Sequence, residues 1–210
     1  DWPDLNRYRA HNAKLGLPGA NENRIVFMGN SITEGWSTVL PEYFSEKSYV
    51  NRGISGQTTP QMLVRFRADV IDLKPKAVVI LAGTNDIAGN TGPATVKMIA
   101  DNIISMAELA RENNILVVIS SVLPVYDYSW KPGLEPVPKI SKLNEIIKNY
   151  ALNHRHTYLD YYAAMVDDKK GLDEKYTSDG VHPNKAGYKV MTTLAEQAIA
   201  KTLDYARLKK

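Results

Sequence analysis

Three short segments of this chain consist almost entirely of apolar residues, and they limit its possible folds more than any other feature. They are Arg24–Gly29 (RIVFMG), Ala77–Gly83 (AVVILAG) and Ile115–Ser120 (ILVVIS). Short β-branched runs bounded by polar residues or glycine are typical of central strands in a parallel sheet that helices cover on both faces. Two weaker segments, Tyr49–Ile54 and Thr157–Asp160, bring the expected sheet to about five strands.

Helical patterns lie between these runs. Apolar residues recur at helical spacing from Ile99 to Ala110, from Ile140 to Ala151, and in a last helix that starts near Asn184. Strands that alternate with helices predict a doubly wound α/β fold, and about five strands are too few for an α/β barrel. The sequence shows no internal repeat or linker, so we expect one domain over residues 1–210.

Composition and charge exclude several kinds of partner. The net charge is +3, and the densest basic clusters, Lys169-Lys170 and Lys209-Lys210, are too short for a nucleic-acid-binding arm. The chain has no cysteine, which excludes disulfides, thiolate nucleophiles and cysteine metal sites. No apolar run approaches the roughly 18 residues of a membrane span. We therefore expect a small-molecule ligand and neither nucleic acid nor a membrane span, and no motif indicates an oligomeric state.

Polar residues follow three of the expected strands where each strand ends, and a fourth polar segment precedes the last expected helix. In an open parallel sheet, ligands bind beyond the carboxyl ends of the strands. Four segments far apart in sequence should therefore meet at one edge of the sheet. They are Gly29-Asn30-Ser31-Ile32-Thr33, Arg52-Gly53-Ile54-Ser55-Gly56, Gly83-Thr84-Asn85-Asp86 and Asp179-Gly180-Val181-His182-Pro183.

Ser31, His182 and Asp179 are the candidate catalytic residues. Ser31 lies in a glycine-containing strand-to-helix turn, where it either caps the next helix or acts as a nucleophile. A serine nucleophile needs a neighbouring base, and His182 has a carboxylate three residues upstream in Asp179. Asp179 could hold the imidazole and stabilise its protonated form, or it could merely cap a turn beside an exposed histidine. A metal site is disfavoured because the pair lacks further ligands at useful spacing.

An esterase also needs hydrogen-bond donors directed at the developing oxyanion. The candidates are the backbone N–H groups of Ser31 and Gly53 and the side-chain amide of Asn85. Glycine lets a backbone approach a ligand closely, which favours Gly53. Asn85 could instead stabilise its own turn.

The four segments resemble the four conserved blocks of the SGNH (GDSL-like) hydrolases. Ser31, Gly53, Asn85 and His182 match the Ser, Gly, Asn and His of that family in order, and Asp179 matches its aspartate three residues before the histidine. The resemblance implies a flavodoxin-like, three-layer α/β/α fold. It also implies ester hydrolysis by a Ser-His-Asp triad without metal or cofactor.

The resemblance extends from about Arg24 to Gly187, with one departure from the family pattern. Asn30 stands where the family usually has aspartate, which removes a charge beside the nucleophile but no triad or oxyanion residue. The stretches MGNSITEGW, NRGISGQTT, LAGTNDI and YTSDGVHPNKAGY are most similar to a bacterial subgroup related to platelet-activating-factor acetylhydrolase. Many of its members are exported and remove acetyl groups from carbohydrates.

Export is therefore expected, with the chain periplasmic or secreted in a bacterium after removal of a signal peptide. The chain begins at Asp1 without methionine, for which a trimmed chain is the alternative explanation. The substrate is expected to be a short acyl ester, in particular an acetylated carbohydrate. Lysophospholipase, thioesterase or arylesterase activity on the same fold, and a catalytically inactive sugar-binding module, are the alternatives.

Aromatic residues in a long loop are candidates for binding the substrate. The loop Ser121–Pro138 leaves the fourth strand, so it should overhang the same edge as the candidate nucleophile. Tyr126, Tyr128 and Trp130 in this loop could line a sugar or acyl site, and we expect Trp130 and Tyr126 to contact substrate. For Trp36 a core position is favoured, because aromatic side chains are usually buried.

Overall fold

A computed structural model describes the backbone of residues 1–207 and the side chains of residues 1–205. Five parallel strands form one sheet in the order β2-β1-β3-β4-β5. Their bounds are β1 Ile25–Gly29, β2 Tyr49–Gly53, β3 Ala77–Ile80, β4 Leu116–Ser120 and β5 Thr157–Leu159. The expected five-stranded parallel sheet is confirmed. Among the described residues no helix combines the length and apolarity of a membrane span, and Lys209-Lys210 lies outside them.

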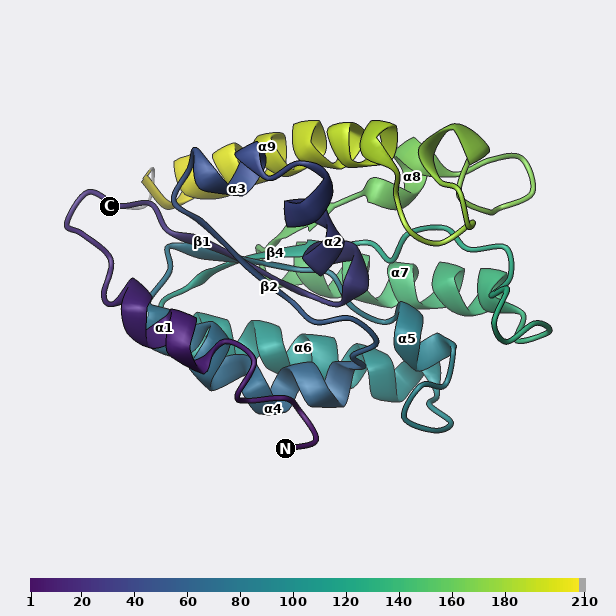
Figure 1. Ribbon diagram of the computed structural model, residues 1–210, viewed down its shortest axis with the longest axis horizontal. Helices are drawn as coiled ribbons and strands as arrows, with labels where there is room; N and C mark the ends of the chain where they lie inside the picture. Colours follow the sequence, from purple (N-terminus) through teal and green to yellow (C-terminus); the bar gives the residue numbers. More distant parts are fainter. Residues whose placement is uncertain (208–210) are drawn as a thin grey trace.

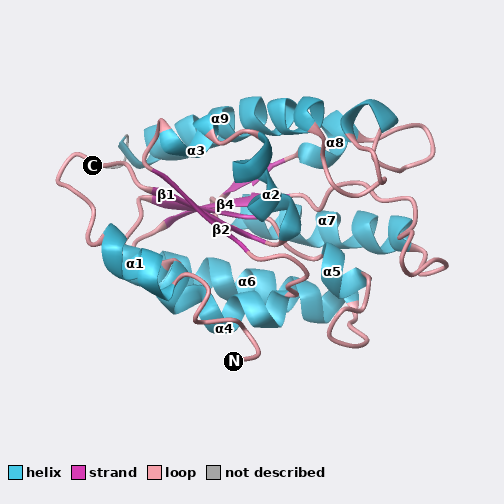
Figure 2. Ribbon diagram, viewed as in Figure 1, coloured by secondary structure: helices cyan, strands magenta, loops and turns pink. Residues whose placement is uncertain are grey.

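Helices cover both faces of the sheet and give three layers (Figures 1 and 2). One face carries α1 Arg9–Leu15, α4 Thr59–Asp69, α5 Thr84–Ile87, α6 Val96–Glu112 and α7 Pro136–Asn153. The other carries α2 Ser31–Val39, α3 Glu42–Ser45, α8 Tyr161–Met165 and α9 Lys185–Arg207. Short 3₁₀ turns occupy Ile71–Leu73 and Glu174–Tyr176. Each crossover helix returns the chain to the start of the next parallel strand, so every strand ends at the same edge.

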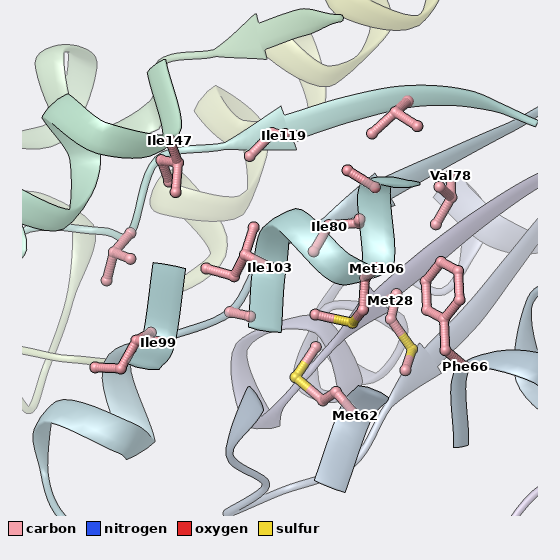
Figure 3. Packing of buried hydrophobic residues seen from close by; sticks show 14 of the residues in the cluster. Met28, Met62, Phe66, Val78, Ile80, Ile99, Ile103, Met106, Ile119 and Ile147 are labelled. Carbon is pink, nitrogen blue, oxygen red and sulfur yellow. The ribbon is translucent and has the colours of Figure 1, made fainter. Parts of the chain in front are cut away.

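Each face of the sheet packs against its own apolar cluster. On one face, side chains from α4 and α6 pack against the strands, and Figure 3 shows Met62, Phe66 and Met106 around Met28. The cluster on the other face is rich in aromatic side chains. The ring centroids lie 5.0–5.9 Å apart in the contacting pairs among Phe27, Trp36, Tyr43 and Phe44. Trp36 is 1% exposed, so its expected core position is confirmed.

The long loop after β4 is shorter than expected, because α7 begins at Pro136. Proline suits the first turn of a helix, where its missing N–H would have no helical partner. Glu135 precedes the helix with a φ of +48°, which turns the chain into α7. The irregular segment is therefore residues 121–135, which still leave the carboxyl end of β4.

Candidate active site

The turn between β1 and α2 presents Ser31 at the edge of the sheet. Ser31 is the first residue of α2 and is half-buried. Asn30 caps the helix through Oδ1, which accepts the Ile32 N–H at 3.2 Å. A Cβ on Gly29 would lie 1.9 Å from Thr33 Oγ1, so the turn requires glycine. Asn30, in place of the aspartate of the resembling family, therefore retains an oxygen that caps the helix.

A continuous chain of hydrogen bonds connects Ser31 to His182 and Asp179. Ser31 Oγ lies 2.9 Å from His182 Nε2, and His182 Nδ1 lies 2.7 Å from Asp179 Oδ2. The other oxygen, Asp179 Oδ1, accepts the N–H groups of Val181 at 2.9 Å and His182 at 2.7 Å. Asp179 therefore combines the two alternatives that the sequence left open. It caps its own turn, and it also holds the imidazole.

The carboxylate fixes the form of the histidine that faces Ser31. Burial raises the pKa of Asp179, but hydrogen bonds from His182 and Val181 outweigh this effect and lower the pKa to about 2. An ionised Asp179 accepts a hydrogen bond from the N–H at Nδ1 of His182. In a neutral imidazole, Nε2 then carries no proton and can accept a hydrogen bond from the Ser31 hydroxyl. In the described part of the chain, no group of three or more His, Asp or Glu side chains could hold a metal ion.

Gly53 does not offer its N–H to this site. That N–H donates to Oδ1 of Asn51 at 2.8 Å, which contradicts the prediction that it faces the oxyanion. The glycine instead allows β2 to approach α2 closely, because a Cβ would lie 2.1 Å from the backbone nitrogen of Glu34. Gly53 thus has a packing role beneath the helix that begins with Ser31.

Asn85 and Gly56 present donors at the same edge. Asn85 is 5% exposed in the first turn of α5, and its Nδ2 donates to the Gln57 carbonyl at 3.0 Å. The amide carries two hydrogens, so one remains for a ligand. Gly56, next to Gln57, has a φ of +77°, and its N–H has no partner among residues 1–207. Sequence reasoning missed Gly56, although it ends the segment placed at this edge.

A buried arginine joins the loops that carry these groups. The Arg65 side chain is fully buried in α4, where it forms an ion pair with Asp69 at 2.9 Å. It also donates to the Gly29 carbonyl at 3.0 Å and to Gln57 Oε1 at 2.6 Å. These contacts hold the β1–α2 turn and the β2–α4 loop against each other. The sequence carries no signal for this role beyond a cation in an amphipathic helix.

Asp86 fixes the α5 turn beside Asn85. Its buried carboxylate accepts the Thr59 N–H at 2.9 Å and the Thr59 hydroxyl at 2.6 Å. The carboxylate thereby caps the N-terminus of α4, a favourable place for a negative charge. Burial is the main influence on this group, and it raises the pKa of Asp86. The α5 turn is thus joined to α4 by a buried contact.

The three loop aromatics occupy different environments. Trp130 is 49% exposed, and its ring lies 6.5 Å from the His182 ring and 5.1 Å from that of Tyr128. Tyr126 is exposed and lines a cavity of about 230 Å³ together with Gly180. Tyr128 is fully buried, and its hydroxyl donates to the Thr84 carbonyl at 2.9 Å. Tyr128 thus supports the loop from below, and it also lines the cavity that Tyr126 lines, so its expected place in a binding site stays a prediction.

Comparison with known proteins shows the family. The model of the GDSL-like lipase/acylhydrolase family matches residues 27–190. This match covers well over half of the chain and includes every residue of the hydrogen-bonded chain from Ser31 to Asp179. The chain belongs to the GDSL-like lipase/acylhydrolase family and is a carboxylic ester hydrolase.

Individual relatives agree with this assignment. A GDSL-like lipase of Bacteroides thetaiotaomicron superposes with a TM-score of 0.93 at 47% identity, over 96% of this chain and 99% of that one. A lipoprotein of Bacillus subtilis is 29% identical over 57% of this chain, and an acetylxylan esterase of Xylanibacter ruminicola is 22% identical over 87%. The chain spans 56% of the lipoprotein and 45% of the esterase.

Proposed function

We propose that this chain removes short acyl groups, chiefly acetyl, from carbohydrate esters. In this proposal Ser31 is the nucleophile, His182 the general base and Asp179 the residue that orients the base. The observation that carries the proposal is the unbroken hydrogen-bonded chain from Ser31 Oγ through both imidazole nitrogens to the Asp179 carboxylate. A serine hydroxyl gains nucleophilic character when a positioned base takes its proton as it attacks.

The reaction proceeds by two acyl transfers. His182 Nε2 takes the hydroxyl proton as Ser31 Oγ attacks the ester carbonyl, which gives a tetrahedral intermediate. The imidazolium then protonates the leaving alcohol, and an acyl-enzyme remains on Ser31. Water repeats the sequence: His182 takes a proton from it, the hydroxide oxygen attacks the acyl carbon, and Ser31 recovers its proton as the acid leaves. Asp179 stabilises the imidazolium in both halves.

Three donors are assigned to the oxyanion in this proposal. They are the N–H of Ser31 at the start of α2, the N–H of Gly56 and the free hydrogen of the Asn85 amide. The Asn85 hydrogen bond to Gln57 supports the assignment, since it places the amide next to the residue that follows Gly56. Donors fixed before the reaction stabilise the developing charge without reorganisation, and each is worth about 10²–10³ in kcat.

The relatives and the loop favour an acetylated carbohydrate as substrate. The Xylanibacter ruminicola relative is an acetylxylan esterase by name, and Trp130 places a half-exposed indole 6.5 Å from the His182 ring. An aromatic face suits the apolar C–H face of a sugar ring. The likeness to a Bacillus subtilis lipoprotein further supports an exported location.

The acyl preference is tested with esters of one alcohol and graded acyl length. Acetyl esters are expected to give a kcat/KM at least about 10-fold above that of octanoyl esters, a difference that pocket contacts of this kind can supply. Acid release from acetylated xylooligosaccharides and from a lysophospholipid, measured in parallel, identifies the alcohol. Faster release from the octanoyl ester or the lysolipid would replace this proposal with a lipase-type one.

Substitution of Trp130 is expected to affect a carbohydrate substrate more than a small activated acetate. Replacing Trp130 with alanine is expected to lower kcat/KM on an acetylated xylooligosaccharide by about 10-fold, while a small activated acetate loses less than about threefold. Remote binding energy is available only to the larger substrate. Tyr126→Ala, which truncates a more exposed aromatic of the same loop, gives the comparison. Equal losses on both substrates would show that Trp130 only supports the loop.

A further inference from the structure

The N-terminal segment before β1 lies outside the matched family region, yet it contacts the loop that carries Gly56. Figure 1 shows this segment, which includes α1, running alongside α4 on one side of the sheet. The Pro3 carbonyl accepts from Gln57 Nε2 at 2.7 Å, and the Tyr8 hydroxyl donates to the Gly53 carbonyl. The loop is thus bound at both ends by residues of the N-terminal segment.

Glu34 joins this segment, the loop and the nucleophile helix. It lies one turn after Ser31 in α2, and its Oε2 accepts both the N–H of Ser55, at 2.9 Å, and the Ser55 hydroxyl. Its Oε1 pairs with Arg7 at 2.6 Å. Burial raises the pKa of Glu34, but the hydrogen bonds from Ser55 and Arg7 outweigh this and lower it below its ordinary range. One carboxylate therefore holds three segments together.

These contacts leave little freedom to the loop around Gly56. The Gly56 carbonyl accepts from Asn90 Nδ2 at 3.1 Å, and Ser55 before it is held by Glu34. Gln57 after it is held by Arg65 at 2.6 Å. Among the described residues, the Gly56 N–H is without a partner while its neighbours are bound on every side. A donor fixed in this way is suited to meet a charge that appears only during the reaction.

We propose that Glu34, clamped by Arg7, is a positioning residue that sets the separation between the oxyanion donors of Ser31 and Gly56. The inference rests on the proposed function. Glu34 does not touch the reacting atoms and acts through Ser55, the residue before Gly56. A shift of the order of 1 Å in a donor can cost about 10²-fold in rate, so the expected signature is a loss of kcat rather than of substrate binding.

The test begins with Glu34→Ala and a small activated acetate. Its kcat is expected to fall about 10- to 100-fold, with KM changed less than about threefold. The affinity of a trifluoromethyl ketone, whose adduct with Ser31 carries the oxyanion, should fall by the same factor as kcat. Arg9→Ala, an exposed arginine of the same segment that contacts Asn6 at 3.4 Å, should leave kcat unchanged.

Arg7→Ala tests the clamp by itself. The expected fall in kcat is smaller, about threefold to 10-fold, because a half-exposed ion pair is screened and the Ser55 contacts persist. In combination with Glu34→Gln, which keeps an acceptor for Ser55 and conserves the fold, Arg7→Ala should add no further loss, since Arg7 acts through the Glu34 charge. If the losses of kcat from the two substitutions added up, Arg7 would not act through Glu34, and this part of the proposal would be overturned.

Two controls separate this inference from the proposed function. A folded Glu34→Ala or Glu34→Gln variant with kcat within about twofold of the parent, beside an inactive Ser31→Ala, would overturn the inference alone. Activity that persists in Ser31→Ala would overturn the proposed function itself. A loss confined to KM, with unchanged ketone affinity, would make Glu34 a substrate-binding residue and also refute the positioning role.

Discussion

Replacing Ser31 with alanine is expected to lower kcat on an acetyl ester by about 10⁴-fold or more, because the members of a triad act as a unit. The proposed base and acid would remain in place without a nucleophile to activate. The fold should survive, since the Asn30 side chain, not Ser31, caps α2, and within the described residues the Ser31 hydroxyl bonds only to His182. Steady-state kinetics and thermal unfolding of the same preparation measure both effects.

Ser37 in the same helix provides a matched control. Its hydroxyl donates to the Glu34 carbonyl at 3.0 Å and accepts from Asn51, so Ser37→Ala removes a bound hydroxyl from α2 without touching His182. We expect this variant to keep kcat within about twofold of the parent, in line with ordinary substitutions away from a site. A folded Ser31→Ala enzyme that retained a tenth of the parent kcat would show that another group attacks the ester.

Asp179→Asn is expected to lower kcat by about 10⁴-fold with the turn intact. An asparagine Oδ1 can still accept the N–H groups of Val181 and His182, as the aspartate does. Its Nδ2, however, would donate toward His182 Nδ1 and favour the tautomer with the proton on Nε2. That nitrogen could then no longer accept the proton of Ser31.

Asp173→Asn is the control for this substitution. Asp173 is a carboxylate of a neighbouring turn, paired with Lys175 at 2.7 Å, and its loss should leave kcat nearly unchanged. Chemical shifts of the His182 ring nitrogens would report the exchanged tautomer directly. If Asp179→Asn lost less than about 10-fold in kcat, Asp179 would serve the turn and contribute little to the reaction.

Much of the fold follows from patterns that one sequence displays. Apolar runs such as Arg24–Gly29 are buried on both faces, so their hydrophobicity is continuous and marks a central strand. The strand ends were predictable to within a few residues, with β3 ending at Ile80 rather than at Gly83. Because all strands are parallel, their carboxyl ends meet at one edge. The grouping of Ser31, which follows β1, with Asn85, which follows β3, could therefore be predicted before any coordinates.

The details of the candidate site depend on side-chain hydrogen bonds that no pattern encodes. Gly53 and Gly56 belong to one segment, but the Asn51 side chain accepts the Gly53 N–H, whereas the Gly56 N–H has no partner in the described part of the chain. Likewise Tyr128 and Trp130 are both aromatic loop residues, yet one is buried against Thr84 and the other is half-exposed. Which N–H is left without a partner and which aromatic side chain is buried depend on tertiary packing.

One turn carries both Asp179 and His182, so the rest of the fold has to position only Ser31 relative to this turn. These two residues are three positions apart, and their contact is fixed by the local geometry of one turn. Ser31 and His182 are separated by 151 positions. The alignment of the proposed triad thus reduces to a single long-range adjustment, the approach of α2 to this turn. A small movement of α2 relative to this turn would alter the distance between Ser31 and His182 and leave the contact between Asp179 and His182 intact.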